Sequence, residues 1–229
     1  GNRQSPDYFL KNTGVKELNY AAALGYSRKS WDAEVFFSSF HTELGILAAS
    51  HIGNLSDLYA SFGRERPLDS AGFSYDIGFP RQDVLHRLLK GKVTRPLGKL
   101  GTLHLLYGYQ QNVRKEFDKT LQTKLPDGSY KPALNFDLRT QHADLYLEHT
   151  IKKRWEGGWG LNGLYQTNNY YGNYFIPNFQ RLSGGLYWVE KWHWQAFSAE
   201  GGLRFDVNHF AVQKWESNVL TEFTHRFSG

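Results

Sequence analysis

The chain has 229 residues, of which 16% are aromatic, and it carries a formal net charge of +5. This aromatic content excludes a disordered chain, and no stretch approaches the ~20 consecutive apolar residues that a transmembrane helix needs. The absence of cysteine excludes disulfides and thiol chemistry, and no lysine–arginine run is long enough to indicate binding to nucleic acid. The mean hydropathy of −0.56 is still compatible with a β-barrel, in which every second strand residue faces a polar lumen.

Hydrophobicity that alternates with a period of two is the main structural signal. Between residues 16 and 27, the apolar positions Leu18, Tyr20, Ala22, Leu24 and Tyr26 alternate with small or polar ones. Successive strand side chains point to opposite faces, so this pattern predicts a strand with one apolar face. Its recurrence predicts nine strands, at 16–27, 31–45, 82–95, 100–113, 142–152, 156–168, 179–190, 194–207 and 217–229. Runs of about 9–13 residues suit tilted strands that cross a bilayer, whereas sandwich strands usually have ~5–6 residues.

The predicted connections fall into two classes that alternate along the chain. Short ones lie at Ser27–Trp31, Pro96–Leu100, Lys152–Glu156 and Glu190–Trp194, and long ones at 46–81, 114–141, 169–178 and 208–216. Bacterial outer-membrane barrels have short periplasmic turns and long outer loops. The sequence therefore predicts an all-β fold, a transmembrane antiparallel up-and-down β-barrel in the outer membrane.

Tryptophan positions support the same arrangement. Six of the seven lie within a few residues of a predicted short turn: Trp31, Trp155, Trp159, Trp188, Trp192 and Trp194. Tryptophan gathers at the boundary between lipid and water, so we predict one aromatic girdle at that end of the strands. The alternative is that these rings pack the edges of a core.

The odd number of predicted strands indicates an incomplete barrel wall. Bacterial single-chain barrels have an even number of strands and leave no free edge. The chain contains no methionine, starts at Gly1 without a signal peptide, and ends at Ser228-Gly229 without a terminal aromatic residue. We therefore expect about nine strands of a larger barrel.

Several segments resemble TonB-dependent outer-membrane receptors. They are the hairpin formed by residues 16–27 and Trp31–Phe37, and the loop segments His51–Leu58 and Gly172–Phe179. The resemblance implies a 22-stranded barrel around an N-terminal plug, which imports a scarce ligand with TonB energy. That ligand would be a siderophore, another metal chelate, an oligosaccharide or a peptide. No segment reads as a plug or TonB box, so residues 1–229 would form one barrel segment. Its partners would be outer-membrane lipid, the plug, the remaining strands and, through a missing N-terminal region, the TonB system.

Candidate ligand-binding residues lie in the predicted long loops. Tyrosine and asparagine combine flat rings with hydrogen-bonding groups, and arginine suits an anion. The candidates are Tyr170, Tyr171, Asn173, Tyr174, Phe175, Asn178, Arg64, Arg66 and Arg81. The structural alternative is that they only hold and solvate the loops.

A second polar set lies on the predicted lumen face, where its members would contact a plug or, preferably, pair with one another. These residues are Asp32, Glu34, Glu148, Glu156, Glu200 and Arg204.

No catalytic, metal or cofactor site is predicted. The histidines lack metal-ligand spacing, and the rim residues His51, Asp57, Asp69 and Asp76 show no specific arrangement. We therefore expect a transport protein that is not an enzyme. Two alternatives stay open: a small self-contained barrel acting as an enzyme or passive pore, and a soluble β-sandwich binding module.

Overall fold

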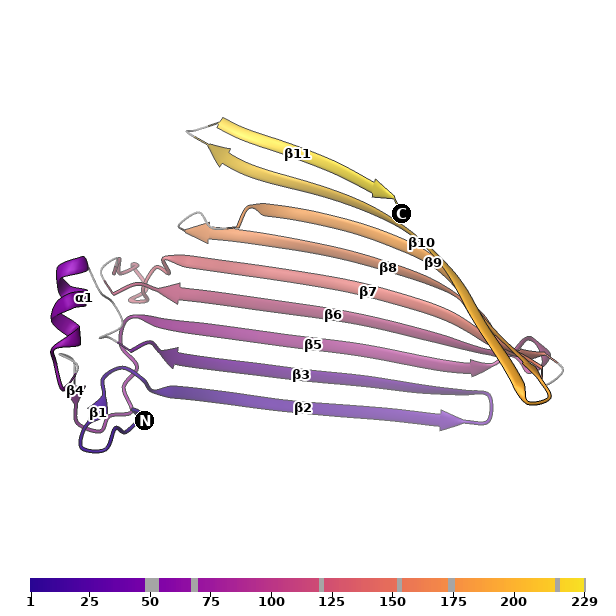
Figure 1. Ribbon diagram of the computed structural model, residues 1–229, viewed down its shortest axis with the longest axis horizontal. Coiled ribbons are helices and arrows are strands. Elements are labelled where there is room, and N and C mark those ends of the chain that lie inside the picture. The colour runs from indigo at the N-terminus through magenta and orange to yellow at the C-terminus, as the bar shows by residue number, and fades with distance from the viewer. Residues whose placement is uncertain are drawn as a thin grey trace.

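The computed structural model describes residues 1–47, 54–66, 70–119, 122–151, 154–172, 176–216 and 219–228. One antiparallel nine-stranded sheet dominates it (Figure 1). Its strands are β2 (Val15–Arg28), β3 (Trp31–Gly45), β5 (Arg81–Pro96), β6 (Thr102–Phe117), β7 (Leu134–Ile151), β8 (Trp155–Gly172), β9 (Asn178–Trp194), β10 (Phe197–Glu216) and β11 (Val219–Ser228). A short second sheet pairs β1 (Phe9–Leu10) with β4 (Ser70–Ala71), and the helices are α1 (Leu55–Phe62) and the 3₁₀ turn Gly98–Leu100.

The topology is up-and-down, as expected. The strand order is β11-β10-β9-β8-β7-β6-β5-β3-β2, so each strand pairs with its neighbours along the chain in this sheet. The two edge strands, β2 and β11, do not pair with each other. The fold is therefore an all-β, barrel-like wall that is curved but not closed (Figure 1).

Strands extend beyond the predicted boundaries at the end opposite the tightest turns. Strand β6 continues to Phe117, β7 starts at Leu134 and β8 continues to Gly172. The predicted long connection at 208–216 is wrong, because these residues belong to β10. The predicted turn at Glu190–Trp194 is also misplaced, since β9 runs to Trp194 and β10 starts at Phe197. Ladder hydrogen bonds join backbone groups, so pairing continues where apolar alternation has stopped.

Connections are thus sorted by length only in part. Residues 46–80 and 118–133 form long connections, and the first contains α1, a helix that the alternation pattern did not predict. The connection between β8 and β9 covers only residues 173–177. We call the end that carries these connections the loop end, and the opposite end, with residues 29–30 and 195–196, the turn end.

The two faces of the sheet differ in polarity. From β2 to β10, one row of paired positions contains only apolar residues and glycines: Leu24, Val35, Gly91, Tyr107, Ala143, Gly163, Gly184 and Val207. The adjacent row, on the other face, is mostly polar: Gly25, Glu34, Lys92, Leu106, Asp144, Asn162, Gly185 and Asp206. We call these the apolar face and the polar face.

The apolar face has no second layer over it among the described residues, which distinguishes the fold from a β-sandwich. Each long strand contacts its sheet neighbours, and Phe117 is the only buried large apolar side chain described. Leu24 is 78% exposed and Leu203 is 73% exposed. A wide apolar hollow of about 630 Å³ runs over β6 to β10 on this face, lined by leucines, Trp159 and Phe205.

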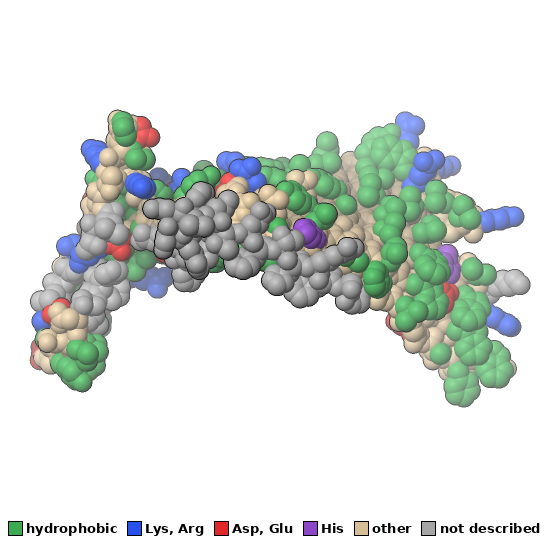
Figure 2. All heavy atoms as spheres, turned by 90° about the horizontal axis from the view of Figure 1, so that it is seen from above, with side chains coloured by type: hydrophobic (Ala, Val, Ile, Leu, Met, Phe, Trp, Pro, Cys, Tyr) green, Lys and Arg blue, Asp and Glu red, His purple; other side chains and the backbone are tan. Residues whose placement is uncertain are grey.

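The predicted tryptophan cluster lies at the turn end of the apolar face. Trp155 pairs with Trp192, their ring centroids 6.2 Å apart, and Trp159 pairs with Trp188 at 5.7 Å. Trp194 stacks on Trp192, and on the first hairpin Trp31 contacts Tyr26 at 5.1 Å. Hydrophobic side chains gather at this end, on the right of Figure 2.

Glycines on the polar face make room for a stack of tyrosine rings. Tyr146 of β7 and Tyr187 of β9 lie opposite Gly160 of β8, and their ring planes are 10° apart. A Cβ atom at Gly160 would overlap the Tyr187 ring. The hydroxyl of Tyr187 donates a hydrogen bond to Asp144 at 3.1 Å. The missing side chain at Gly160 therefore leaves the Tyr187 ring space to reach this carboxylate.

The predicted charged set does occupy the polar face, but its partners differ from those expected. Glu34 pairs with Lys90 at 3.5 Å and Glu148 with His104 at 3.1 Å. Glu156 pairs with His193, Arg204 pairs with Asp206, and Asp32 accepts a hydrogen bond from the hydroxyl of Ser27. For these five residues the expected pairing within the set is wrong, because closer partners lie on neighbouring strands or, for Arg204, on the same strand.

Candidate functional site

The loop end of β8, β9 and β10 carries a cluster of side-chain amides. A small cavity of about 80 Å³ is lined there by Asn168, Asn169, Asn178, Gln180 and Gln213. Asn168 is 4% exposed, whereas Asn169 projects into solvent. We call these five residues the amide rim.

Backbone contacts hold the amide rim in place. The Asn178 Oδ1 atom accepts a hydrogen bond from the backbone N–H of Tyr170 at 2.6 Å. The Asn168 Nδ2 atom donates to the carbonyl of Pro177 at 3.3 Å. These contacts join the ends of β8 and β9 across their connection, so the rim is part of the sheet itself.

The predicted tyrosines divide between the two faces. Tyr170 lies on the polar face, where its ring is 5.6 Å from Phe136 and its hydroxyl donates to Gly172 O at 2.5 Å. Tyr171 lies on the opposite face and is 64% exposed. Asn173, Tyr174 and Phe175 lie outside the described residues. Of the predicted tyrosine–asparagine cluster, the structure thus places Tyr170 and Asn178 in contact.

None of the predicted arginines lines the cavity of the amide rim, and two of them, Arg64 and Arg66, lie just after α1. Arg66 pairs with Asp7 and lies over the ring of Tyr8 at 5.5 Å. Arg64 follows α1, where its backbone N–H bonds to Ser61 O at 3.3 Å.

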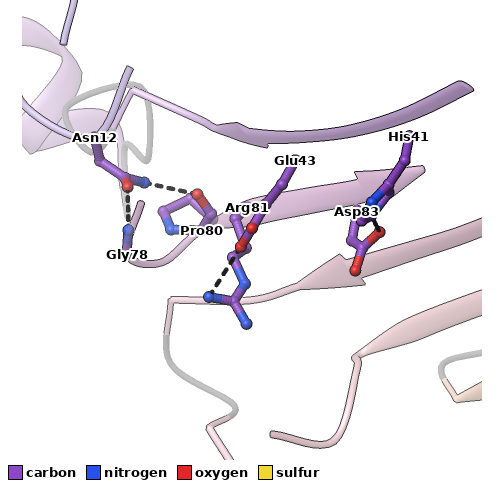
Figure 3. Close-up of polar contacts among 7 residues, drawn as sticks. All are labelled: Asn12, His41, Glu43, Gly78, Pro80, Arg81 and Asp83. Carbon is purple, nitrogen blue, oxygen red and sulfur yellow. Dashed lines mark hydrogen bonds and ion pairs between the residues drawn. The ribbon is translucent and has the colours of Figure 1, made fainter. Parts of the chain in front are cut away.

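Arg81 lies in a third place, between two aromatic rings. Its guanidinium is 4.9 Å from the ring of Phe79 and 4.7 Å from that of Phe117. It also pairs with Glu43 at 3.3 Å (Figure 3). Both Arg66 and Arg81 therefore contact acidic and aromatic side chains of the protein itself.

Sequence reasoning missed four members of the amide rim: Asn168, Asn169, Gln180 and Gln213. Gln213 lies in a segment that was assigned to a loop, and Gln180 lies within a predicted strand. The run Gln166-Thr167-Asn168-Asn169 carried a usable signal, since it is polar at every position.

The amide rim offers neutral hydrogen-bonding groups. A side-chain amide both donates and accepts, so the rim matches hydroxyl or peptide groups better than a strong charge. The cavity volume of about 80 Å³ equals the space that two to three water molecules occupy in the liquid, at about 30 Å³ each. It can therefore hold an edge of a ligand, but not a whole drug-sized molecule.

Other chemistry is sparse in the part of the chain that the structure describes. There, no group of three or more histidine, aspartate and glutamate side chains is placed to hold a metal ion. Among the same residues, no helix has both the length and the apolar character that crossing a membrane requires. Asn54 caps the first turn of α1, where its Oδ1 atom accepts a hydrogen bond from the backbone N–H of Asp57 at 2.9 Å. His51 and Asp69 lie outside the described residues.

Comparison with known proteins gives a match among solved structures. No protein-family model matches the sequence, and no curated protein sequence matches it. Among solved structures, the iron transporter FrpB from Neisseria meningitidis (F5-1 variant, apoprotein form) matches with a TM-score of 0.60. The match has 11% sequence identity and covers 95% of this chain but 33% of FrpB, so the chain spans about a third of that protein's length. At this identity the likeness concerns the fold: the chain resembles a sector of the FrpB structure.

Proposed function

We propose that this chain forms part of the wall of an outer-membrane transport receptor. Such a receptor binds a scarce ligand at the loop end and admits it past a plug with TonB energy. The observation that carries the proposal is the exposed apolar face, bounded at one end by tryptophan, on a sheet that resembles FrpB along 95% of this chain.

The apolar face has the height of a membrane barrel. Leu182 and Trp192 lie on this face of β9, ten residues apart. At about 3.3 Å per residue they are separated by roughly 33 Å along the strand, which projects to about 25 Å at a tilt near 40°. This is the ~25 Å height of the apolar band on outer-membrane barrels. Water would be a poor solvent for such a face, and lipid a good one.

Free edges support membership of a larger barrel. Strands β2 and β11 each have one unpaired edge in the sheet. In hydrocarbon an unpaired backbone N–H or C=O costs several kcal/mol, because nothing there can satisfy it. Further strands that pair with β2 and β11 would remove this cost. The match covers only 33% of FrpB, so the similar structure contains additional chain that could supply such strands.

The ligand proposal follows from the loop end and from the neighbour. FrpB is described as an iron transporter, and a ferric chelate is therefore the first ligand class to test. The neutral amide rim would contact hydroxyl or amide groups on the chelator, while the metal stays inside its own chelate.

Iron uptake in cells tests the proposal. The gene encoding this chain would be deleted and uptake of ⁵⁵Fe from a panel of ferric siderophores measured under iron limitation, with and without TonB. We expect the deletion to abolish uptake of one chelate, and the loss of TonB to have the same effect. Uptake that needs the gene but not TonB would indicate a passive pore. A chain that fractionates with soluble proteins after cell breakage would refute the membrane proposal altogether.

A further inference from the structure

A second cavity lies at the loop end, away from the amide rim. It has a volume of about 380 Å³ and lies between the N-terminal segment, the residues after β4 and the connection that follows β6. Its lining includes Asn2, Lys11, Ser74, Asp76, Phe79 and Lys119. We call it the N-terminal cavity. Nothing in the proposed transport function uses it.

Hydrogen bonds fix the walls of this cavity. Asn12 has a positive φ of 59° and donates from Nδ2 to Ile46 O at 2.8 Å and to Pro80 O at 2.7 Å. Its Oδ1 atom accepts from Gly78 N–H at 2.8 Å (Figure 3). One side chain therefore joins three separate chain segments, and its own polar groups are fully used by the protein.

One polar group of the wall has no such partner. Asn2 is 8% exposed, and its backbone N–H donates to Ser74 O at 2.9 Å. Its Nδ2 atom donates to Gly72 O at 3.4 Å, while the buried Oδ1 atom has no hydrogen-bond partner within the described residues. Buried acceptors in folded proteins are almost always satisfied, so this oxygen calls for a donor from outside the protein.

The rest of the lining adds hydrogen-bonding groups and an apolar wall. The Asp76 Oδ2 atom accepts a hydrogen bond from the Ser74 hydroxyl at 3.1 Å, and the exposed carboxylate has a second oxygen, Oδ1, that can accept as well. Lys11 and Lys119 contribute ammonium donors, and Phe79 contributes an aromatic ring. Acceptors, donors and a ring in one cavity match a molecule with several hydroxyl groups and an apolar face.

We propose that the N-terminal cavity binds a sugar unit of monosaccharide size. A hydroxyl of the sugar would donate to Asn2 Oδ1, a second would donate to Asp76, and the C–H face of the ring would lie against Phe79. The volume is at the low end of the ~300–1,000 Å³ typical of small-ligand sites, so it holds one sugar ring. The site is independent of the transport proposal, because it uses none of the amide rim.

Binding of free sugars to the full chain in detergent micelles tests this inference. Saturation-transfer NMR and calorimetry would be run with a panel of neutral hexoses, with the corresponding hexuronates, and with cyclohexanecarboxylate as a ring without hydroxyls. We expect at least one sugar to bind and cyclohexanecarboxylate not to bind. A stronger signal from the hexuronates would assign the two lysines to a carboxylate. Failure of every sugar, or equal binding of cyclohexanecarboxylate, overturns the inference.

Two different substitutions locate the site. Asn2→Leu removes the free acceptor, and Ala71→Phe fills the cavity, which Ala71 lines, without removing a polar group. Each should weaken sugar binding about ten-fold or more, as expected when a site loses a buried partner or its space. Asn19→Leu, on β2 and outside the cavity, is the matched control and should bind as the parent does. Sugar binding that survives both substitutions overturns the assignment, and thermal unfolding of each variant confirms that it is folded.

Discussion

Leu186→Arg tests whether the apolar face contacts lipid. Leu186 lies on β9, between Leu161 and Phe205 on the neighbouring strands, and is 56% exposed. It is six residues from Trp192, or about 20 Å along the strand and roughly 15 Å along the membrane normal. That distance places it near the middle of a ~25 Å apolar band.

The expected cost depends on what surrounds the side chain. At an exposed position in water, a Leu-to-Arg change is usually within about 0.5 kcal/mol of neutral. On the lipid face of a barrel, an arginine at the midplane costs about 2–4 kcal/mol. A cost of 3 kcal/mol corresponds to a change of more than 100-fold in the unfolding equilibrium constant, at about 1.4 kcal/mol per factor of ten.

Leu164→Arg is the matched control, because it makes the same chemical change on the polar face. Leu164 lies between His142 and Ser183, so an arginine there would reach polar neighbours. We expect this variant to stay within about 1 kcal/mol of the parent protein, since lumen-facing positions tolerate charge.

The assay is urea unfolding of the chain in phospholipid vesicles, followed by tryptophan fluorescence. The difference between the two arginine variants is the decisive quantity, because it removes effects common to both. A cost below about 0.5 kcal/mol for Leu186→Arg would show that this face meets water. An equal cost for Leu164→Arg would show that the two faces do not differ in environment, and would refute the assignment.

Three further predictions each concern a single contact or close approach. Gly160→Val should lower stability by about 1–3 kcal/mol in the same unfolding assay, because its side chain would separate the stacked tyrosines, as overpacking does. Gly163→Val is the control and should lower stability much less, because the nearest heavy atom to its new Cβ would be 4.0 Å away. Asn12→Ala should lower the free energy of unfolding by about 1–3 kcal/mol and speed hydrogen exchange in residues 2–14, because it leaves buried backbone groups without partners. Unchanged hydrogen exchange would contradict this prediction. The Ser129 hydroxyl and N–H donate to Asp127 and hold the pKa of that carboxyl below its ordinary value of 3.8. The stabilisation of this turn is therefore present above that value and lost as the pH falls through the lowered pKa; Ser129→Ala should raise the Asp127 pKa in an NMR titration.

Much of the wall is predictable from the sequence because the signal is local. Whether Leu18, Tyr20 and Leu24 share a face depends only on their spacing along one strand. The same holds for Trp155 and Trp159, which lie two strand repeats apart and so share a face. Nine strands and the tryptophan cluster follow from such local patterns.

Strand ends were less predictable, since they depend on pairing. Residues 208–216 alternate weakly, yet they continue β10 because β9 and β11 offer backbone partners there. A hydrogen-bond ladder does not require apolar side chains. Sequence patterns therefore marked the apolar band and missed the polar extension beyond it.

The sequence by itself determined the strands, their two faces and the end at which tryptophan gathers, because each depends on neighbours a few residues apart. Tertiary structure alone decided which polar groups meet. Asn2 reaches Gly72 across 70 positions, and Asn12 reaches Pro80 across 68. It also separated Arg66 from the amide rim and placed a bare glycine beneath two tyrosines. Contacts of this kind depend on how distant segments fold together, and no periodicity along the chain encodes them.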